Sequence, residues 1–454
     1  MSDAPAFPPG SGPGGGPETD PIAGPAVASL DTRVDGLEIA VPDLDIRVDA
    51  LEAEVDRVTG GVVYVDDPQF GGGPSKSAAE NSAAIAAAVA ALGPAGGEIH
   101  FGLGGYNHNG FNIDSKRGLQ FIGKAGMSGN AGEGTRLMYK GTASPAISAR
   151  STVGLHIEEM AILYDNAAFT GDLMDFSQLV SDTAYLTMER CVIGGKGVRG
   201  ALKLLKLDKV IISHFTDCVF TDAQRLVEGQ AAAGSYSNAI TFENCTFQRS
   251  VLQETRNAGE AWTFRDCTFE QRCLADGTSA GAGAYAFAAG VLSENLTFEN
   301  CWFGDADATG DWITFAGKGL VVKGCHIGSG ALGIRLGDGN IEGVEISGNR
   351  FDNVATAGIS LNNTGNKNIV IEGNHISGST PKIIQFGGTF PVNSRIQTES
   401  DTTYSADAPV FTATVNDGSF PFTPIDGQFA LENVAGTVKA CWRVAGAWKK
   451  VVLA

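Results

Sequence analysis

The sequence predicts an all-β protein built mainly as a parallel β-helix, a solenoid whose coils stack along one axis. A coiled coil precedes this solenoid and a small β module follows it. Three observations support the prediction. A short sequence phrase recurs through the central region, and a heptad pattern precedes it. The chain also has 61 glycines and only 17 prolines without a Gly-X-Y period; this composition excludes collagen and indicates many tight turns.

The amino-acid composition indicates which classes of partner the protein lacks. The 32 basic and 51 acidic residues give a formal charge of −19, which repels phosphate backbones, so we expect no nucleic-acid partner. No run of 18 apolar residues occurs, so we expect no membrane insertion. Residues 1–26 are rich in proline and glycine and lack the basic-then-apolar pattern of a signal peptide. They are predicted to be a flexible segment.

Residues 27–58 carry the heptad pattern. Apolar residues recur every seven positions in two complementary phases, at Val27, Val34, Val41, Val48 and Val55, and at Leu30, Leu37, Leu44, Leu51 and Val58. Such a pattern predicts a coiled coil, and the alternative is one amphipathic helix packed on the body. Pro42 predicts a kink between its two halves. Valine at heptad position a with leucine at position d favours a coiled coil of two helices. The expectation of a trimer therefore depends on the β-helix and not on this segment.

The central region repeats one phrase, seen best in ITFENCTF at 240–247, WTFRDCTF at 262–269 and LTFENCWF at 296–303. A period mostly in the twenties, made of short β segments with Gly or Asn turns, fits one coil of a parallel β-helix. A leucine-rich repeat would need a Leu-x-x-Leu-x-Leu phrase, which is absent. One position of the phrase holds Met160, Cys191, Cys218, Cys245, Cys267, Cys301, Cys325, Asn349 and Asn374.

Alternation within the phrase predicts which side chains point inward. In the 240–247 copy, Phe242, Cys245 and Phe247 point in, Glu243 and Thr246 point out, and the chain bends at Asn244. Stacked coils would then align the cysteines as an interior ladder of free thiols. Metal binding and disulfides are the alternatives, but one cysteine per coil gives none of the close spacing that zinc sites use. We therefore expect no metal site and no cofactor.

The segment from Val62 to Asn107 resembles the entry of the pectate-lyase-like β-helix superfamily. It reads as a strand, a glycine-rich turn, a helix at 78–92 and a Gly-Gly-strand-Gly-Tyr phrase from Gly96 to Tyr106. Family members usually carry Gly-Asp and Asp-Asp-Thr here, where this chain has Gly72-Gly73 and Glu80-Asn81-Ser82. The resemblance implies a right-handed parallel β-helix over residues 59–395, with entry strand and capping helix at 62–107. The helix would cover the open first coil.

Residues 396–454 are predicted to form the small C-terminal β domain, ending in an aromatic Trp-Lys hairpin around Trp442 and Trp448. Together with the rod and the coils, this organisation resembles a phage tail spike or tail fibre. That resemblance implies a homotrimer on the virion as a tail appendage, assembled in the host cytoplasm. It also implies attachment to baseplate or tail proteins through the N-terminal segment, and contact with a host surface glycan.

The best candidate for glycan contact is the outward position that follows the cysteine ladder. Along successive coils it holds Thr246, Thr268, Trp302, His326, Arg350 and His375. An exposed aromatic beside hydrogen-bond donors suits a sugar ring, so Trp302, His326, Arg350 and His375 are the predicted contacts. Because interfaces also enrich tryptophan and arginine, burial of this face between chains is an equal alternative.

Catalysis is the less favoured hypothesis. The best acidic group is Asp305, Asp307 and Asp311 in GDADATGD, whose spacing partly resembles a calcium loop, and a solvated loop is the alternative. Three functions remain: a receptor-binding fibre, a polysaccharide depolymerase acting as lyase or glycosidase, and a purely structural spike. The sequence favours the first, because it shows no carboxylate pair on adjacent coils of one outward stripe.

Overall fold

The computed structural model describes residues 61–124, 134–229, 237–256, 259–270, 285–286, 293–304, 310–337, 341–361, 365–386, 391, 393–397, 403–405, 410–411, 429–434 and 437–452. The chain divides into two compact units, Met1–Val58 and Thr59–Ala454, and every described residue belongs to the second. The predicted coiled coil at 27–58 and the segment at 1–26 therefore lie outside the described residues and stay predictions.

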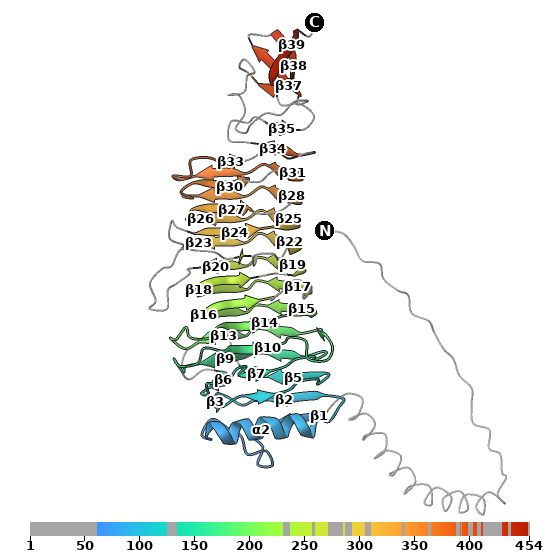
Figure 1. Ribbon diagram of the computed structural model, residues 1–454. Coiled ribbons are helices and arrows are strands. Elements are labelled where there is room, and N and C mark those ends of the chain that lie inside the picture. The colour runs from blue at the N-terminus through green and yellow to red at the C-terminus, as the bar shows by residue number, and fades with distance from the viewer. Residues whose placement is uncertain are drawn as a thin grey trace, which may run out of the picture. The chain divides into compact units, whose positions relative to one another are not determined.

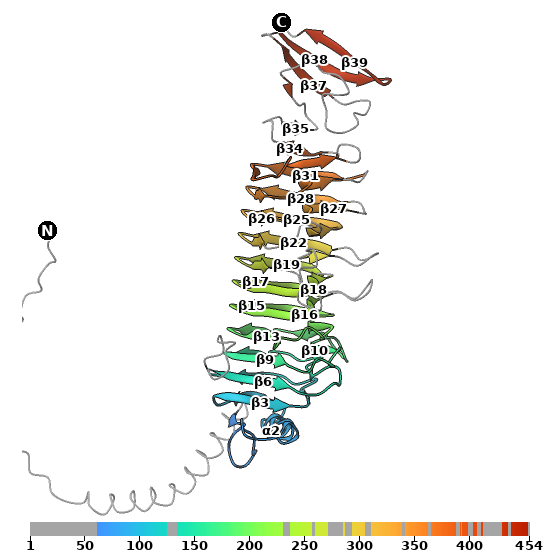
Figure 2. The same ribbon diagram turned by 90° about the vertical axis from the view of Figure 1, so that its left-hand side faces the viewer.

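The second unit is a parallel β-solenoid in which each coil runs through three faces in turn (Figures 1 and 2). Face A is a sheet of its own, whose strands pair in parallel from β1 to β34 and end on the antiparallel strand β35. Its strands are β1 (Gly61–Tyr64), β2 (Gly97–His100), β5 (Leu119–Ile122), β8 (His156–Glu158), β11 (Thr183–Ala184), β12 (Thr187–Glu189), β15 (Val210–Thr216), β17 (Asn238–Glu243), β19 (Glu260–Arg265), β22 (Ser293–Glu299), β25 (Gly317–Lys323), β28 (Glu342–Ser347), β31 (Lys367–Glu372), β34 (Arg395–Gln397) and β35 (Thr403–Ser405).

Faces B and C together make the second sheet, because β16 and β18 run continuously across both. Face B contains β3 (Gly104–His108), β6 (Thr135–Tyr139), β9 (Met160–Tyr164), β13 (Val192–Gly195), the first parts of β16 (Val219–Glu228) and β18 (Thr246–Arg256), β20 (Thr268–Glu270), β23 (Trp302–Gly304), β26 (His326–Gly328), β29 (Arg350–Asp352) and β32 (His375–Ser377). Face C contains β4 (Phe111–Asn112), β7 (Ile147–Ser148), β10 (Asp172–Asp175), β14 (Lys203–Lys206), the ends of β16 and β18, β21 (Tyr285–Ala286), β24 (Asp311–Phe315), β27 (Leu332–Leu336), β30 (Ala357–Leu361) and β33 (Ile384–Phe386).

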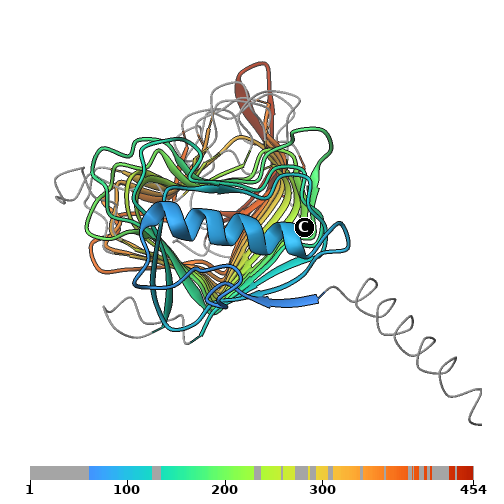
Figure 3. The ribbon, with the colours of Figure 1, turned by 90° about the horizontal axis from the view of Figure 1, so that it is seen from below.

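Helix α2 (Ala78–Ala91) closes the first coil (Figure 3). A capping box begins it: Ser77 accepts a hydrogen bond from the Glu80 backbone, and the Glu80 carboxylate accepts one from the Ser77 backbone. It ends at Leu92 and Gly93, where Gly93 has φ of 64°. The buried side of the helix, which includes Ile85 and Val89, packs against the core. The predicted helix at 78–92 is thus confirmed to within one residue.

The corner between faces A and B follows the predicted phrase. Asn244 has φ of 52°, and Asp217, Asp266 and Asn300 occupy the same place in their coils with φ between 52° and 54°. Left-handed backbone suits Asn and Asp better than other side chains, which explains why the phrase favours them there. The inward and outward positions are also as predicted: Phe242, Cys245 and Phe247 are buried, while Thr246 is partly exposed.

Two aromatic ladders fill the middle of the core. Phe215, Phe242, Phe264 and Phe298 stack from face A, and Phe220, Phe247, Phe269 and Phe303 stack from face B, with ring centroids 4.6–5.1 Å apart. Because coils repeat at the strand spacing, equal residues at equal positions stack their rings directly. This is why the sequence repeats the same aromatic phrase.

The cysteine ladder lies beside these aromatic ladders. All six of its cysteines are free and buried, so the structure confirms an interior free-thiol ladder. Each thiol lies near a backbone carbonyl of the preceding coil; Cys245, for example, is 3.3 Å from the Phe215 oxygen. Where the ladder continues as Asn349 and Asn374, the side-chain amides donate to the corresponding carbonyls at 2.8 Å. Asparagine thus makes the same contact as cysteine with a stronger donor.

A separate four-stranded sheet forms the end of the described chain. It contains β36 (Val410–Phe411), β37 (Phe429–Val434), β38 (Thr437–Val444) and β39 (Ala447–Val452). Strands β38 and β39 pair as a hairpin whose turn has positive φ at Ala445 and Gly446. The predicted boundary after residue 395 falls inside β34, so the division into domains at that point stays a prediction.

Candidate functional site

The predicted outward row is continuous on face B. The strand registers place Thr246, Thr268, Trp302, His326, Arg350 and His375 directly above one another on successive coils; we call these six residues the face B row. Their neighbours Cys301 and Phe303 are buried, and the side chains of the row are partly or fully exposed. The four predicted contact residues are therefore brought together on one surface, and glycan contact itself stays a prediction.

Trp302 lies flat against the strand that carries it. A Cβ atom added to Gly304 would come within 2.2 Å of Cζ2 and Cη2 of the Trp302 ring, so the indole occupies the space above this glycine. On the next coil, Gly328 carries no side chain beside His326. The two glycines leave room beside the partly exposed indole, a setting in which an aromatic ring can stack on a flat ligand.

Polar contacts orient the two residues that follow Trp302. Arg350 Nε donates to Ser377 Oγ at 3.0 Å, and that hydroxyl donates to Asp352 Oδ1 at 2.9 Å. The other oxygen of Asp352 lies 3.8 Å from both the Arg350 guanidinium and His326 Nε2. Asp352 and Ser377, which the sequence reasoning did not select, therefore position the side chains of His326 and Arg350.

Of the acidic candidates, only Asp311 belongs to the described residues; Asp305 and Asp307 lie outside them, so the group stays a prediction. Asp311 begins β24 on face C, and its carboxylate binds Arg335 Nε at 2.5 Å on the neighbouring coil. Across the described ranges, no group of three or more His, Cys, Asp or Glu side chains is placed to hold a metal ion.

Face C carries a charged cluster that sequence reasoning missed. Lys203 on β14 lies between two carboxylates, with its Nζ 2.9 Å from Glu228 and 3.7 Å from Asp172. The cluster also contains Asp175, Lys206, Arg225 and Arg256. Acidic residues from β10 and β16 thus meet across the strand between them. Asp172 and Glu228 lie two coils apart, with β14 between them, so they do not contradict the expectation that no carboxylate pair lies on adjacent coils of one outward stripe. These residues belong to face C, which the repeated phrase does not include.

The two carboxylates beside Lys203, Asp172 and Glu228, have different surroundings. Burial raises the pKa of Asp172, and its Oδ1 has no hydrogen-bond partner. Glu228 is more deeply buried, but Lys203, Arg225 and Arg256 all lie within 3.7 Å of its oxygens. An acid that tends to keep its proton therefore lies near a carboxylate surrounded by cations.

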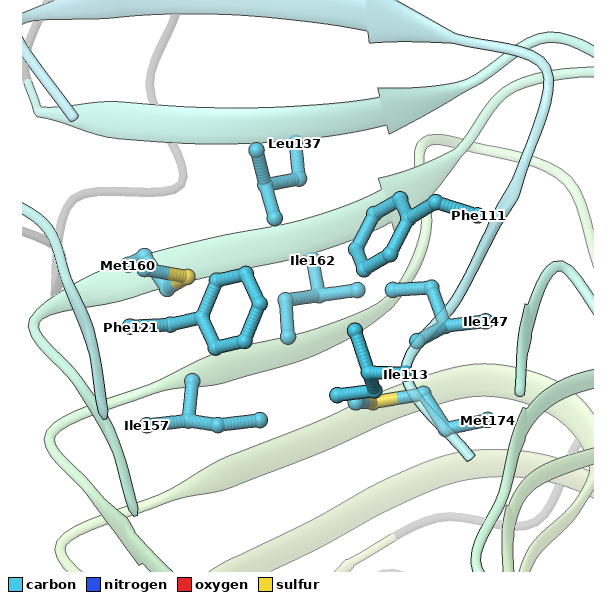
Figure 4. Close-up of a pocket in the computed structure, with 9 residues that line it drawn as sticks. All are labelled: Phe111, Ile113, Phe121, Leu137, Ile147, Ile157, Met160, Ile162 and Met174. Carbon is cyan, nitrogen blue, oxygen red and sulfur yellow. The ribbon is translucent and has the colours of Figure 1, made fainter. Parts of the chain in front are cut away.

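A cavity inside the first coils offers no site for a polar ligand (Figure 4). It is lined only by apolar side chains, namely Phe111, Ile113, Phe121, Leu137, Ile147, Ile157, Met160, Ile162 and Met174. A sugar or ion would find no hydrogen-bond partner there, so the cavity belongs to the packing of the wide first coils. None of the helices described here is long and apolar enough to span a bilayer.

Comparison with known proteins identifies the fold. Residues 233–398 match the family model described as a right-handed beta helix region. Comparison with curated proteins found no relative. Among solved structures, the chain is similar to ORF18 of Geobacillus virus E2, with 14% identity, a TM-score of 0.54, and 91% of this chain and 79% of that chain covered.

Two further structures are similar to the same degree. The tailspike protein gp49 from Pseudomonas phage LKA1 shares 11% identity at a TM-score of 0.50, covering 82% of this chain and 83% of that chain. The A-module of the Azotobacter vinelandii mannuronan C-5 epimerase AlgE4 shares 17% identity at a TM-score of 0.51, covering 74% of this chain and all of that chain. At such identities the likeness concerns the fold alone. The chain is thus a right-handed parallel β-helix protein with a fold like that of phage tailspikes.

Proposed function

We propose that the chain is a tail appendage of a phage virion that binds a polysaccharide of the bacterial surface through four residues of the face B row, namely Trp302, His326, Arg350 and His375. The observation that carries the proposal is Trp302, whose indole lies over Gly304 and begins a run of donors at His326, Arg350 and His375. A stacked aromatic ring with hydrogen-bond donors at the strand spacing suits successive sugars of an extended chain. The shared fold with a phage tailspike protein supports the location on a virion.

Further parts of the proposal concern assembly. We propose a parallel homotrimer, held in part by the predicted coiled coil at 27–58, with virion baseplate or tail proteins bound through residues 1–26. The free thiols of the described cysteines fit assembly in the reducing cytoplasm of the host. A pectate-lyase-like ancestry and a separate C-terminal module at 396–454 remain part of this proposal.

The test compares Trp302→Ala with Thr268→Ala, the matched substitution one coil earlier in the same row. Removing the indole should weaken binding to purified host-surface polysaccharide by about 1 to 3 kcal/mol, roughly 5- to 150-fold in Kd, while Thr268→Ala stays near the wild type. Affinity is measured by biolayer interferometry on the intact protein, together with its melting temperature. Equal affinity of Trp302→Ala and the wild type would refute the role of the row.

A depolymerase is the second candidate, favoured by the pairing of Asp172 and Glu228 around Lys203. In glycoside hydrolysis, a protonated carboxyl delivers a proton to the leaving oxygen while a carboxylate activates water or attacks the sugar. Asp172 would take the first role and Glu228 the second. Host polysaccharide incubated with the wild type should then gain reducing ends, and Asp172→Asn should abolish that gain. Unchanged polysaccharide after long incubation with the wild type would reject this candidate.

A further inference from the structure

A row of left-handed residues runs along face A, near the start of its strands. The registers stack these residues coil on coil, and each has φ between 50° and 73°; we call them the kink row. In chain order they are Gly118, Gly154, Tyr185, Ile212, Ala239, Ala261, Asn295, Gly319, Gly343, Asn368 and Asn393.

Residue types change along the kink row. From Asn295 onward every position holds asparagine or glycine, the residues that tolerate left-handed backbone best. The first two positions, Gly118 and Gly154, are glycines as well. The next two hold Tyr185 and Ile212, and a β-branched residue such as Ile212 is among the least suited to this conformation. The sequence therefore keeps large apolar side chains here against the preference of the backbone. A side chain that is unfavourable in left-handed backbone is kept where the surrounding structure or a function requires that side chain.

The same two side chains point to solvent. Tyr185 is 56% exposed and Ile212 is 40% exposed, on adjacent coils. The turn ahead of Tyr185 adds Leu179 and Val180, which are 48% and 80% exposed. Ser151 Oγ accepts the backbone N–H groups of Leu179 and Val180 and so holds this turn in place. We call Leu179, Val180, Tyr185 and Ile212 the apolar corner; it lies where the chain passes from face C to face A.

We propose that the apolar corner is a contact between copies of this chain in the homotrimer. The inference rests on the trimer of the proposed function and names the surface that forms it. Clustered exposed apolar side chains mark interaction sites, and a buried contact would offset the strain at Tyr185 and Ile212. Within the described chain, the side chains of Tyr185 and Ile212 are not buried, so packing inside one chain does not offset this strain.

The segment that precedes the solenoid indicates that the partner of the apolar corner is a second copy of this chain. The predicted heptads end at Val58 and β1 begins at Gly61, so parallel chains would emerge together and enter their first coils at the same height. In a parallel arrangement, the apolar corners of the copies lie at the same height along their solenoids. Each copy carries a net charge of −19, so copies repel except where uncharged surface meets. The apolar corner consists of four uncharged side chains.

This placement has a consequence for the face B row. The corner between faces C and A is separated from face B by face A on one side and by face C on the other. Copies that meet at the apolar corner would leave Trp302 and its neighbours accessible. The inference therefore favours glycan contact over burial of the face B row between chains.

The test uses the full chain with the double substitution Tyr185→Asn and Ile212→Asn. Asparagine already occupies the kink row at three later coils, so the double variant should fold with an unchanged circular dichroism spectrum. Multi-angle light scattering and sedimentation should show the wild type as a trimer. The midpoint concentration for dissociation into monomers should be at least about tenfold higher for the variant than for the wild type. Asn368→Gly, in the polar part of the same row, is the matched control and should assemble like the wild type.

The outcomes separate this inference from the proposed function. Loss of the trimer in the double variant, with Trp302-dependent glycan binding kept by each chain, supports the apolar corner as the contact. A double variant that assembles as tightly as the wild type overturns it, while the trimer itself stands. A monomeric wild type overturns both the apolar corner and the proposed trimer, and glycan binding by that monomer would still support the face B row.

Discussion

Asparagine at position 349 should be replaceable by cysteine but not by alanine. Asn349 continues the cysteine ladder: its Nδ2 donates to the Val322 carbonyl at 2.8 Å, and its Oδ1 accepts from the Cys325 backbone at 2.8 Å. Cys325 does the same one coil earlier, because its sulfur accepts from the Cys301 backbone at 3.4 Å and lies 3.7 Å from the Phe298 carbonyl. A thiol at 349 would meet the same two backbone groups.

The magnitude follows from the groups left without partners. In Asn349→Ala, the buried Val322 carbonyl and the Cys325 N–H both lose their hydrogen bonds. Each such group costs about 1 to 3 kcal/mol, so the free energy of unfolding should fall by roughly 2 to 6 kcal/mol. Asn349→Cys keeps longer and weaker versions of both contacts and should lose less than about half as much.

Two measurements check this prediction. Guanidinium unfolding gives the change in stability, and hydrogen exchange followed by mass spectrometry reports on the peptide that contains Cys325. The amide of Cys325 should exchange faster in the alanine variant, because its acceptor is gone, and should stay protected in the cysteine variant. Equal loss of stability and of protection in the two variants would refute the idea that cysteine and asparagine serve one structural role in the ladder.

Two further predictions concern thiols and acid. The buried ladder cysteines should resist labelling in the native protein and react only after denaturation, because burial raises the pKa of thiols such as Cys191 and Cys245; rapid native labelling would contradict this. Burial opposes ionisation of Asp114, but hydrogen bonds from Arg150 and Ser148 outweigh it and lower its pKa. Its stabilisation is therefore present above the unfolded pKa near 3.9 and is lost as pH falls through the lower folded pKa. Asp114→Asn should lower the free energy of unfolding by about 1 to 3 kcal/mol at pH 7 and flatten its fall below pH 4, measured by denaturant unfolding across pH.

Sequence reasoning predicted those parts of the fold in which one coil repeats the chemistry of the next. Phe242, Cys245 and Phe247 could be placed because strand alternation and the phrase fix their direction, and the register then aligned Trp302 with His326 and Arg350. The helix was predicted at 78–92 from the resemblance of its segment to the pectate-lyase-like entry, and its capping box and its end before Gly93 give the physical reason for its bounds. These features depend on neighbours within a few residues or one coil period away.

The features that sequence reasoning missed depend on contacts between coils outside the repeated phrase. Asp172 and Glu228 both lie beside Lys203 because the register of β10, β14 and β16 brings them there, and the phrase does not fix that register on face C. The position of the Trp302 ring depends on Gly304, whose role as a floor is visible only once the ring has been placed.

The residue types in the kink row are not explained by the backbone conformation that its members share. All eleven of its described members share one backbone conformation, so that conformation cannot explain why Tyr185 and Ile212 differ from Gly154 and Asn295. A purely structural row would converge on asparagine or glycine throughout, since both lower the cost of left-handed backbone. The large apolar side chains stand between Gly154 and Ala239, next to the turn with the exposed Leu179 and Val180. A requirement that selects apolar surface on these two coils would explain the departure, and the proposed contact between chains is such a requirement.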